Sequence, residues 1–275
     1  MTAADLVPLR VAAVQAESRA GDVEHNVAVV VEWVVKAAAE GAGLVVFPEL
    51  FLPGYDIKTL SEAPEACDVT TDDRRLEPIA TAARSGGIAV LVSASLREDG
   101  TRSLALLSFA ATGELRVAYV KQHLWEDERA VFTSGARGAS VVLGGWDVGL
   151  GICYDGCFPE HARAAADAGA LVYVCPSAYV VGSEHRRDLY YAARAIDNGV
   201  YVVFAGLVGR CGDLDFSGGT AVYDPQGRVV ERIESGEGMV VVDLDRSVVD
   251  EARRINPYER DRVENEAERL VLTLR

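Results

Sequence analysis

The sequence has no long apolar run and no excess of basic residues. None of its 275 residues belongs to a stretch approaching about eighteen consecutive apolar residues, and the N-terminus, MTAADLVPLR, lacks a basic region followed by an apolar one. We therefore expect neither a membrane-spanning helix nor a secretion signal. Lys and Arg number 27 against 42 Asp and Glu, a formal net charge of −15. This balance argues against nucleic acid or an anionic membrane as a partner.

The sequence also lacks a cysteine framework typical of small secreted domains. Its five cysteines are an odd number, at positions 67, 153, 157, 175 and 211. Without a secretion signal, this number favours free thiols and a cytoplasmic location. Hydrophobic residues make up 49% of the chain and charged residues 25%, which is enough for one sizeable core. We expect a single α/β domain over residues 1–275.

Apolar runs and helical patterns alternate along most of the chain. Strands are predicted at residues 9–16, 44–47, 88–96, 139–143, 146–152, 171–175, 200–206 and 239–245, with hairpins at 102–121 and 218–233. Helices are predicted at residues 22–40, 72–85, 158–168, 184–198 and 246–254. Residues 50–60 are interpreted as a loop, and residues 122–135 as a loop with one helical turn. The last stretch, 256–275, has little pattern and is expected to pack on another subunit.

Residues 146–161, WDVGLGICYDGCFPEH, change from a strand pattern to a helical one. The apolar run ends at Cys153, so its thiol would project from the end of the sheet. The N–H groups at the start of a helix stabilise an anion, and a thiol placed there loses its proton more easily. We interpret Cys153 as a candidate nucleophile. The alternative for an isolated cysteine is a buried residue that merely ends a strand.

Two further polar residues follow strand-like runs. Glu49 comes after LVVFP and Lys121 after LRVAYV. If these strands and the one before Cys153 run toward one edge, the three side chains converge. A thiolate attacks a carbonyl or nitrile carbon, a carboxylate moves protons, and an ammonium group stabilises an oxyanion. Taken alone, Glu49 could be a solvated turn acid or a helix cap, and Lys121 a surface charge.

Three blocks around these residues resemble the signatures of the nitrilase, or carbon–nitrogen hydrolase, superfamily. They are FPELFLPGY at 47–55, KQHL with ERAVFTSG within 121–135, and GLGICYDGCFPEHAR at 149–163, in the order typical of that family. The resemblance continues through 167–178 and 192–206, so it covers essentially the whole chain. It implies an α/β fold, a four-layer α-β-β-α sandwich that pairs into an eight-layer homodimer and often assembles further. It also implies that no metal or organic cofactor is needed.

The resemblance further implies a role for each matching residue. Cys153 matches the nucleophile, Glu49 the general base that later acts as an acid, and Lys121 the lysine that stabilises the oxyanion. Glu128 matches a second glutamate that orients the substrate and the lysine. The backbone N–H of Tyr154 would be the other oxyanion donor. A small amide would then be hydrolysed to ammonia and a carboxylic acid through a thioester.

The residues after the nucleophile favour one branch of the family. Nitrilases usually carry Cys-Trp-Glu, whereas this chain has Cys153-Tyr154-Asp155, which resembles the amidase and carbamoyl-hydrolase branches. N-carbamoyl hydrolysis and nitrile hydrolysis remain the alternatives, and a catalytically silent scaffold is an alternative of another class. The synthetase branch would need an added domain and the acyltransferase branch membrane spans, and we expect neither here.

Substrate selectivity is expected in loops over the site. Candidate substrate-binding residues are Tyr55, Trp125, Tyr179, Arg186 and Arg187, the last two within the run His185-Arg186-Arg187. A guanidinium group near the pocket would favour a substrate carboxylate through a bidentate pair. The alternative for the basic run is pairing with Glu184 and Asp188 on the surface of a helix. His123 is interpreted as structural, or as a hydrogen-bonding residue within its own loop.

Two short patterns resemble cofactor sites only in part. Cys153, Cys157 and His161 recur every four residues, but they form no CxxC pair, supply only three ligands and have Pro159 between them. A dinucleotide loop would need a third glycine where Tyr154 stands.

Overall fold

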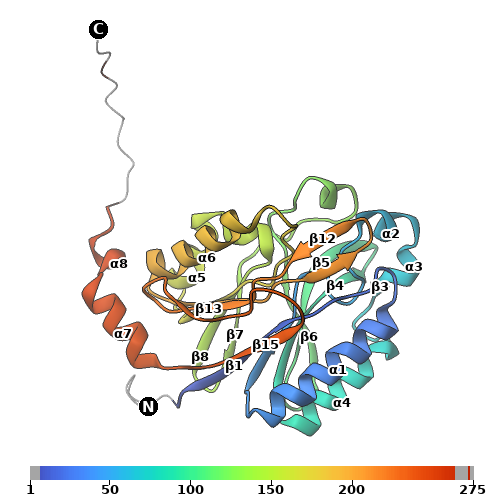
Figure 1. The fold of residues 1–275 in the computed structure, drawn as a ribbon, viewed down its shortest axis with the longest axis horizontal. Coiled ribbons are helices and arrows are strands. Elements are labelled where there is room, and N and C mark those ends of the chain that lie inside the picture. Colours follow the sequence, from blue (N-terminus) through green and yellow to red (C-terminus); the bar gives the residue numbers. More distant parts are fainter. Residues whose placement is uncertain (1–6, 264–271, 273–275) are drawn as a thin grey trace.

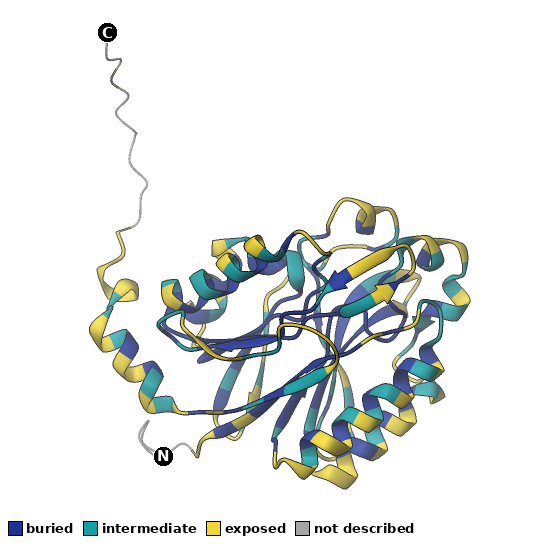
Figure 2. Ribbon diagram, viewed as in Figure 1, coloured by how far each residue is buried: buried dark blue, intermediate teal, exposed yellow. Residues whose placement is uncertain are grey.

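The computed structural model describes residues 7–263 and 272 and contains two β-sheets stacked between two pairs of helices (Figure 1). Helices α1 and α4 cover one sheet, and α5 and α6 cover the other (Figure 1). Buried residues concentrate in the sheets, and the exposed ones lie on the outer faces of the helices (Figure 2). The predicted α-β-β-α sandwich is therefore confirmed, whereas its pairing into a dimer stays a prediction.

The first sheet has seven strands in the order β15-β1-β2-β4-β5-β6, with β3 paired to β4. Its strands are β1 (Leu9–Gln15), β2 (Leu44–Val46), β3 (Asp68–Val69), β4 (Ala89–Glu98), β5 (Thr101–Phe109), β6 (Leu115–Val120) and β15 (Gly238–Leu244). The strands β1, β2 and β4 are parallel to one another. The β4–β5 and β5–β6 pairs are antiparallel, so β6 runs in the same direction as β2.

The second sheet has six strands in the order β14-β13-β10-β9-β8-β7. Its strands are β7 (Ala139–Leu143), β8 (Trp146–Leu150), β9 (Val172–Val174), β10 (Tyr201–Phe204), β13 (Ala221–Tyr223) and β14 (Val229–Arg232). Here β8, β9 and β10 are parallel. A separate hairpin consists of β11 (Val208–Cys211) and β12 (Leu214–Ser217).

The helices follow the apolar stripes of the sequence. They are α1 (Val23–Ala39), α2 (Ile57–Glu62), α3 (Pro64–Cys67), α4 (Glu77–Gly86), α5 (Pro159–Asp167), α6 (Glu184–Asn198), α7 (Arg246–Ile255) and α8 (Tyr258–Asp261). In α1 the side chain of Asp22 accepts a hydrogen bond from the His25 N–H at 3.1 Å, which caps the first turn. Helix α6 ends at Gly199, whose φ of 56° is left-handed.

Most predicted elements are confirmed, with shifts of one to a few residues at their ends. The loop predicted at 50–60 is wrong from residue 57 on, where α2 begins. The side chain of the preceding N-cap residue, Asp56, accepts a hydrogen bond from the Thr59 N–H at 3.2 Å. The β11–β12 hairpin, α3 and α8 were not predicted, because each is too short to show a period. Residues 264–271 and 273–275 of the predicted packing tail lie outside the described residues, and its contact with another subunit stays a prediction.

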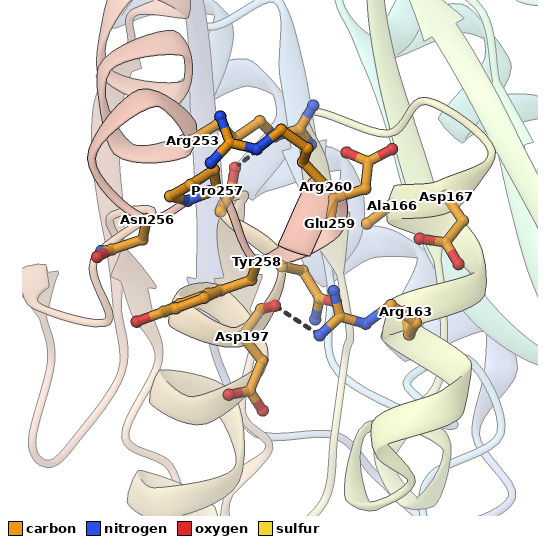
Figure 3. A pocket seen from close by; sticks show the side chains of 12 residues that line it. Arg163, Ala166, Asp167, Asp197, Arg253, Asn256, Pro257, Tyr258, Glu259 and Arg260 are labelled. Carbon is orange, nitrogen blue, oxygen red and sulfur yellow. Dashed lines mark hydrogen bonds between the residues drawn. The ribbon is translucent and has the colours of Figure 1, made fainter. Parts of the chain in front are cut away.

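A cavity of about 110 Å³ lies where α7 and α8 meet α5 and the end of α6 (Figure 3). Two of its arginines contact backbone carbonyls: Arg163 Nη2 donates to the oxygen of Asp197 at 2.6 Å, and Arg253 Nη2 to that of Ala170 at 2.9 Å. These contacts hold helix ends together. Among the described residues, we find no helix that is both long and apolar enough to cross a membrane.

Candidate active site

Glu49 lies just beyond the carboxyl end of β2 and is fully buried. The next residue, Leu50, has a left-handed φ of 46°, so the chain turns sharply there. One carboxylate oxygen, Oε1, contacts Lys121 Nζ at 2.6 Å. The other, Oε2, is buried and has no hydrogen-bond partner among the described residues. It is therefore the oxygen left to interact with another molecule or a reacting proton.

Lys121 follows β6 and is fully buried as well. Because β6 and β2 run in the same direction, both residues emerge at one edge of the first sheet. The ammonium group of Lys121 also contacts both carboxylate oxygens of Glu128, each at 2.8 Å. A buried charge needs such partners, since desolvation otherwise disfavours it strongly.

Glu128 lies on η3 (Asp127–Ala130), the helical turn predicted in this loop, and is 1% exposed. The hydroxyl of Tyr55 donates to its Oε1 at 2.7 Å, and the backbone N–H of Trp125 donates to its Oε2 at 2.8 Å. With the two contacts from Lys121, both oxygens of Glu128 are occupied. This carboxylate therefore fixes the position of the lysine.

Cys153 begins the 3₁₀ turn η4 (Cys153–Cys157), which follows β8 in the second sheet. Its φ of 44° is left-handed and unfavourable for a residue with a Cβ. Neighbouring groups hold this backbone: its N–H donates to the oxygen of Pro176 at 2.9 Å, and its carbonyl accepts from the Tyr191 hydroxyl at 3.2 Å. The thiol lies near enough to Glu49 for each group to shift the pKa of the other. The structure thus brings Glu49, Lys121 and Cys153 together from both sheets.

The charges in this cluster do not balance, because two carboxylates surround one ammonium group. Burial raises the pKa of Glu49 to about 7, and the charge of Lys121 opposes that shift. Burial lowers the pKa of Lys121, but the charges of Glu49 and Glu128 outweigh it and raise that pKa above its ordinary value. Burial and the Glu49 charge raise the pKa of Cys153, so the more easily lost proton expected for a thiol at the start of a helix is wrong for this residue. The cluster therefore pairs a protonated thiol with a carboxylate that gains and loses a proton near neutral pH.

Comparison with known proteins gives this arrangement a family. The family model for carbon–nitrogen hydrolases matches residues 10–254. The chain belongs to the carbon–nitrogen hydrolase family. An (R)-stereoselective amidase of Pseudomonas sp. is 32% identical over 92% of this chain and 91% of the amidase. A 2-oxoglutaramate amidase of Bacillus subtilis is 28% identical over 82% of this chain and 87% of that protein.

Solved structures agree with the family assignment. An amidase of Nesterenkonia sp. AN1 superposes on this hydrolase with a TM-score of 0.80, at 29% identity over 92% of this chain and 99% of that one. In a variant of that amidase, acrylamide has added covalently to the active-site cysteine. This chain is therefore a hydrolase of the amidase type.

The predicted substrate-binding residues of the hydrolase have different surroundings. Tyr179 is buried, with its hydroxyl 3.6 Å from Cys157 Sγ, and Trp125 is 42% exposed. Arg186 is exposed. Arg187 is buried instead: it pairs with Asp188 at 2.8 Å and donates to the oxygen of Gly218 at 2.9 Å. The pair with Asp188 agrees with part of the helix-pairing alternative, but Arg187 is buried and not on the helix surface, and its guanidinium group binds the protein itself.

The sequence interpretation missed the surroundings of Asp155. This residue is fully buried and receives hydrogen bonds from the backbone and ring of His123 and from the hydroxyl of Tyr119. His123 therefore bonds outside its own loop. The motif Cys-Tyr-Asp indicates a branch of the family, but its local pattern does not report the distant partners of Asp155.

The histidine considered as a metal ligand has other partners. His161 lies between Tyr119 and Tyr173. Its Nε2 is 2.9 Å from the Tyr119 hydroxyl oxygen, and its Nδ1 is 2.9 Å from the Tyr173 hydroxyl oxygen. Within residues 7–263 and 272, no three His, Cys, Asp or Glu side chains are grouped to hold a metal ion.

Proposed function

We propose that this hydrolase cleaves the C–N bond of a small linear amide, with Cys153 as the nucleophile and Glu49 as the acid and base. The observation that carries the proposal is the buried cluster in which Lys121 and the Cys153 thiol face the same carboxylate, whose pKa is about 7. A base with a pKa near the working pH both accepts and returns a proton efficiently.

The first half of the reaction forms a thioester. Glu49 takes the thiol proton as Cys153 Sγ attacks the amide carbon, and the oxyanion is held by Lys121 and the Tyr154 N–H. Glu49 then gives the proton to the nitrogen. The C–N bond breaks, ammonia leaves, and the acyl group stays on the sulfur.

The second half regenerates the enzyme. Glu49 removes a proton from water, whose oxygen attacks the thioester carbon. The same two donors hold the second oxyanion. The C–S bond breaks, and the thiolate regains a proton from Glu49 as the carboxylic acid leaves. Glu128 takes no proton in this scheme and holds Lys121 in place.

Aromatic side chains favour a substrate with an apolar portion near the nucleophile. The Trp125 and Tyr154 rings lie 4.9 Å apart in an edge-to-face arrangement, and Tyr154 packs the same way on Phe158 at 4.9 Å. Since Arg187 is engaged with the protein, Arg186 is the guanidinium group of that run available for a substrate carboxylate. The protein would act as a homodimer or larger oligomer in the cytoplasm.

The test is ammonia release from aliphatic amides, ω-amides of dicarboxylates, N-carbamoyl amino acids and nitriles, with Cys153→Ala as the control variant. Release from amides that disappears in Cys153→Ala supports the proposal. Preferential release from N-carbamoyl amino acids or nitriles would assign the enzyme to another branch. No release from any class, together with a Cys153 thiol that resists alkylation, would leave the scaffold alternative.

A further inference from the structure

The geometry points to Asp155 as a positioning residue that fixes the nucleophile turn against the strand that ends at Lys121. This inference rests on the proposed function, because it concerns the alignment of the two groups that would hold the oxyanion. Asp155 is two residues from Cys153 and belongs to the second sheet's η4 turn. Its partners Tyr119 and His123 flank Lys121 at the edge of the first sheet.

Four donors occupy the carboxylate of Asp155. Its Oδ1 accepts from the backbone N–H of His123 at 2.9 Å and from the ring Nδ1 of His123 at 2.8 Å. Its Oδ2 accepts from the Tyr119 hydroxyl at 2.8 Å and from the Ile152 N–H at 3.0 Å. Three donors come from the segment around Lys121, and the fourth comes from the nucleophile turn itself. The carboxylate therefore joins two sheets at the site.

The hydrogen bonds behind Tyr119 have one consistent direction. Because the Tyr119 hydroxyl gives its proton to Asp155, His161 Nε2 donates to the Tyr119 oxygen, at 2.9 Å. His161 Nδ1 then accepts from the Tyr173 hydroxyl at 2.9 Å. This arrangement needs a neutral His161, and burial lowers the pKa of that ring. Each donor in this series of hydrogen bonds points its proton toward Asp155. The series therefore stabilises the negative charge of the Asp155 carboxylate.

The same turn presents the proposed oxyanion donor. The Asp155 N–H donates to the Ile152 oxygen at 3.0 Å, and the Cys153 N–H donates to Pro176. Among the described residues, no backbone oxygen outside η4 accepts a hydrogen bond from the Tyr154 N–H. The hydrogen bonds of Cys153 and Asp155, the two neighbours of Tyr154, fix the direction of the Tyr154 N–H. The hydrogen bonds from Tyr119 and His123 to Asp155 hold Lys121 at a fixed position relative to that N–H. A displacement of about 1 Å between such groups can lower a rate by about 100-fold.

The decisive variant is Asp155→Asn, which keeps the shape but replaces one acceptor oxygen with an NH₂ group that faces donors. We expect kcat for the best amide to fall at least about 100-fold, with KM within threefold. Reaction of the Cys153 thiol with methyl methanethiosulfonate forms no oxyanion, so its rate should stay within about threefold of wild type. Asp147→Asn, the same change on β8 at a residue outside the site, is the matched control and should leave all three values unchanged.

Tyr119→Phe provides a second test that keeps the carboxylate, in case Asp155→Asn does not fold. Removing one of four donors should lower kcat about five- to tenfold and leave the thiol rate unchanged. The inference is overturned if kcat stays within threefold in a folded Asp155→Asn or in Tyr119→Phe. It is also overturned if kcat, thiol rate and melting temperature fall together, since that pattern marks a purely structural residue. A wild-type protein inactive on every amide would instead overturn the proposed function.

Discussion

Glu49 and Asp155 are both fully buried carboxylates near the nucleophile, yet their surroundings are opposite. Glu49 has one strong contact, to Lys121 at 2.6 Å, and a second oxygen with no partner among the described residues. Asp155 accepts four hydrogen bonds, two on each oxygen. Glu49 therefore keeps lone pairs for a reacting proton, whereas Asp155 has none to spare.

This difference shows that burial alone does not make a carboxylate reactive. Burial raises the pKa of Glu49 to about 7 because few hydrogen bonds compensate its charge. A carboxylate surrounded by donors serves as an anchor for the groups that supply them. The number of donors around a buried acid thus separates the proposed proton carrier from the proposed positioning residue.

The strongest test of this comparison is Glu49→Gln, which removes the proton carrier and keeps its shape. We expect kcat/KM for amides to fall by about 10⁴-fold, at the upper end of general acid–base effects. The reaction of the Cys153 thiol should also slow at neutral pH, unlike in Asp155→Asn. Ammonia release and the thiol rate are the measurements, with exposed Glu62→Gln as the control. A variant that keeps more than a tenth of the activity would contradict the assignment.

Lys121→Ala removes the ammonium group that contacts the carboxylates of both Glu49 and Glu128. The two buried acids would then lack this positive charge. Loss of one oxyanion donor should lower kcat by about 10²- to 10³-fold, or ~3 to 4 kcal/mol in the transition state. Steady-state kinetics on the best amide is the measurement. Lys58→Ala, a change of an exposed lysine, should be silent. Equal activity of the two variants would exclude Lys121 from the mechanism.

The pH profile tests the state of Glu49 directly. Its carboxylate must be deprotonated to take the thiol proton, and its pKa is about 7. We therefore expect kcat/KM to approach a tenfold fall per pH unit below about 7, so that roughly 50-fold is lost between pH 7 and pH 5. A profile that stays flat down to pH 5 would mean that another group is the base.

Glu49 was predicted from the sequence, and the role of Asp155 was not, for a physical reason. Glu49, Lys121 and Cys153 each directly follow an apolar strand, and the direction of a parallel strand places its end at a known edge. The pattern therefore made them candidates without tertiary information, and the resemblance to the family implied their roles. The partners of Asp155 lie 32 and 36 residues earlier, in the other sheet, and no local pattern reports a contact between two sheets.

The fold shows the same division between local and tertiary information. Strand and helix periods predicted most of the individual strands and helices, and the resemblance to the family implied their arrangement in four layers. Short elements such as α2 and the β11–β12 hairpin carry too few residues for a period. The basic run at Arg186 and Arg187 was ambiguous because charge alone does not say which guanidinium is buried. Only packing distinguishes Arg187, which binds Gly218, from its exposed neighbour.

The free energy of unfolding should depend on pH because the negative charge of Glu49 is unfavourable in the folded protein. Its folded pKa, about 7, exceeds the ordinary value of 4.5. The stability that this group contributes is therefore fully present below pH 4.5 and is lost as pH rises through 7. Glu49→Gln should be more stable than wild type by about 1–3 kcal/mol at pH 8 and by less than about 1 kcal/mol at pH 5. Denaturant unfolding at both values checks this, and a variant less stable at pH 8 would contradict it.

The smallest expected effect concerns Glu128, a third buried carboxylate. Like Asp155, it receives contacts on both oxygens, from Lys121, Tyr55 and the Trp125 N–H. It should therefore behave as an anchor, and Tyr55→Phe, which removes one donor of several, should lower kcat only about five- to tenfold. If Tyr55 instead contacts substrate directly, as its predicted place in a loop over the site suggested, KM will rise while kcat stays constant. Steady-state kinetics of Tyr55→Phe, measured beside the exposed control Tyr258→Phe, separates these outcomes. A change in KM alone would mean that Tyr55 contacts the substrate and does not act through Glu128.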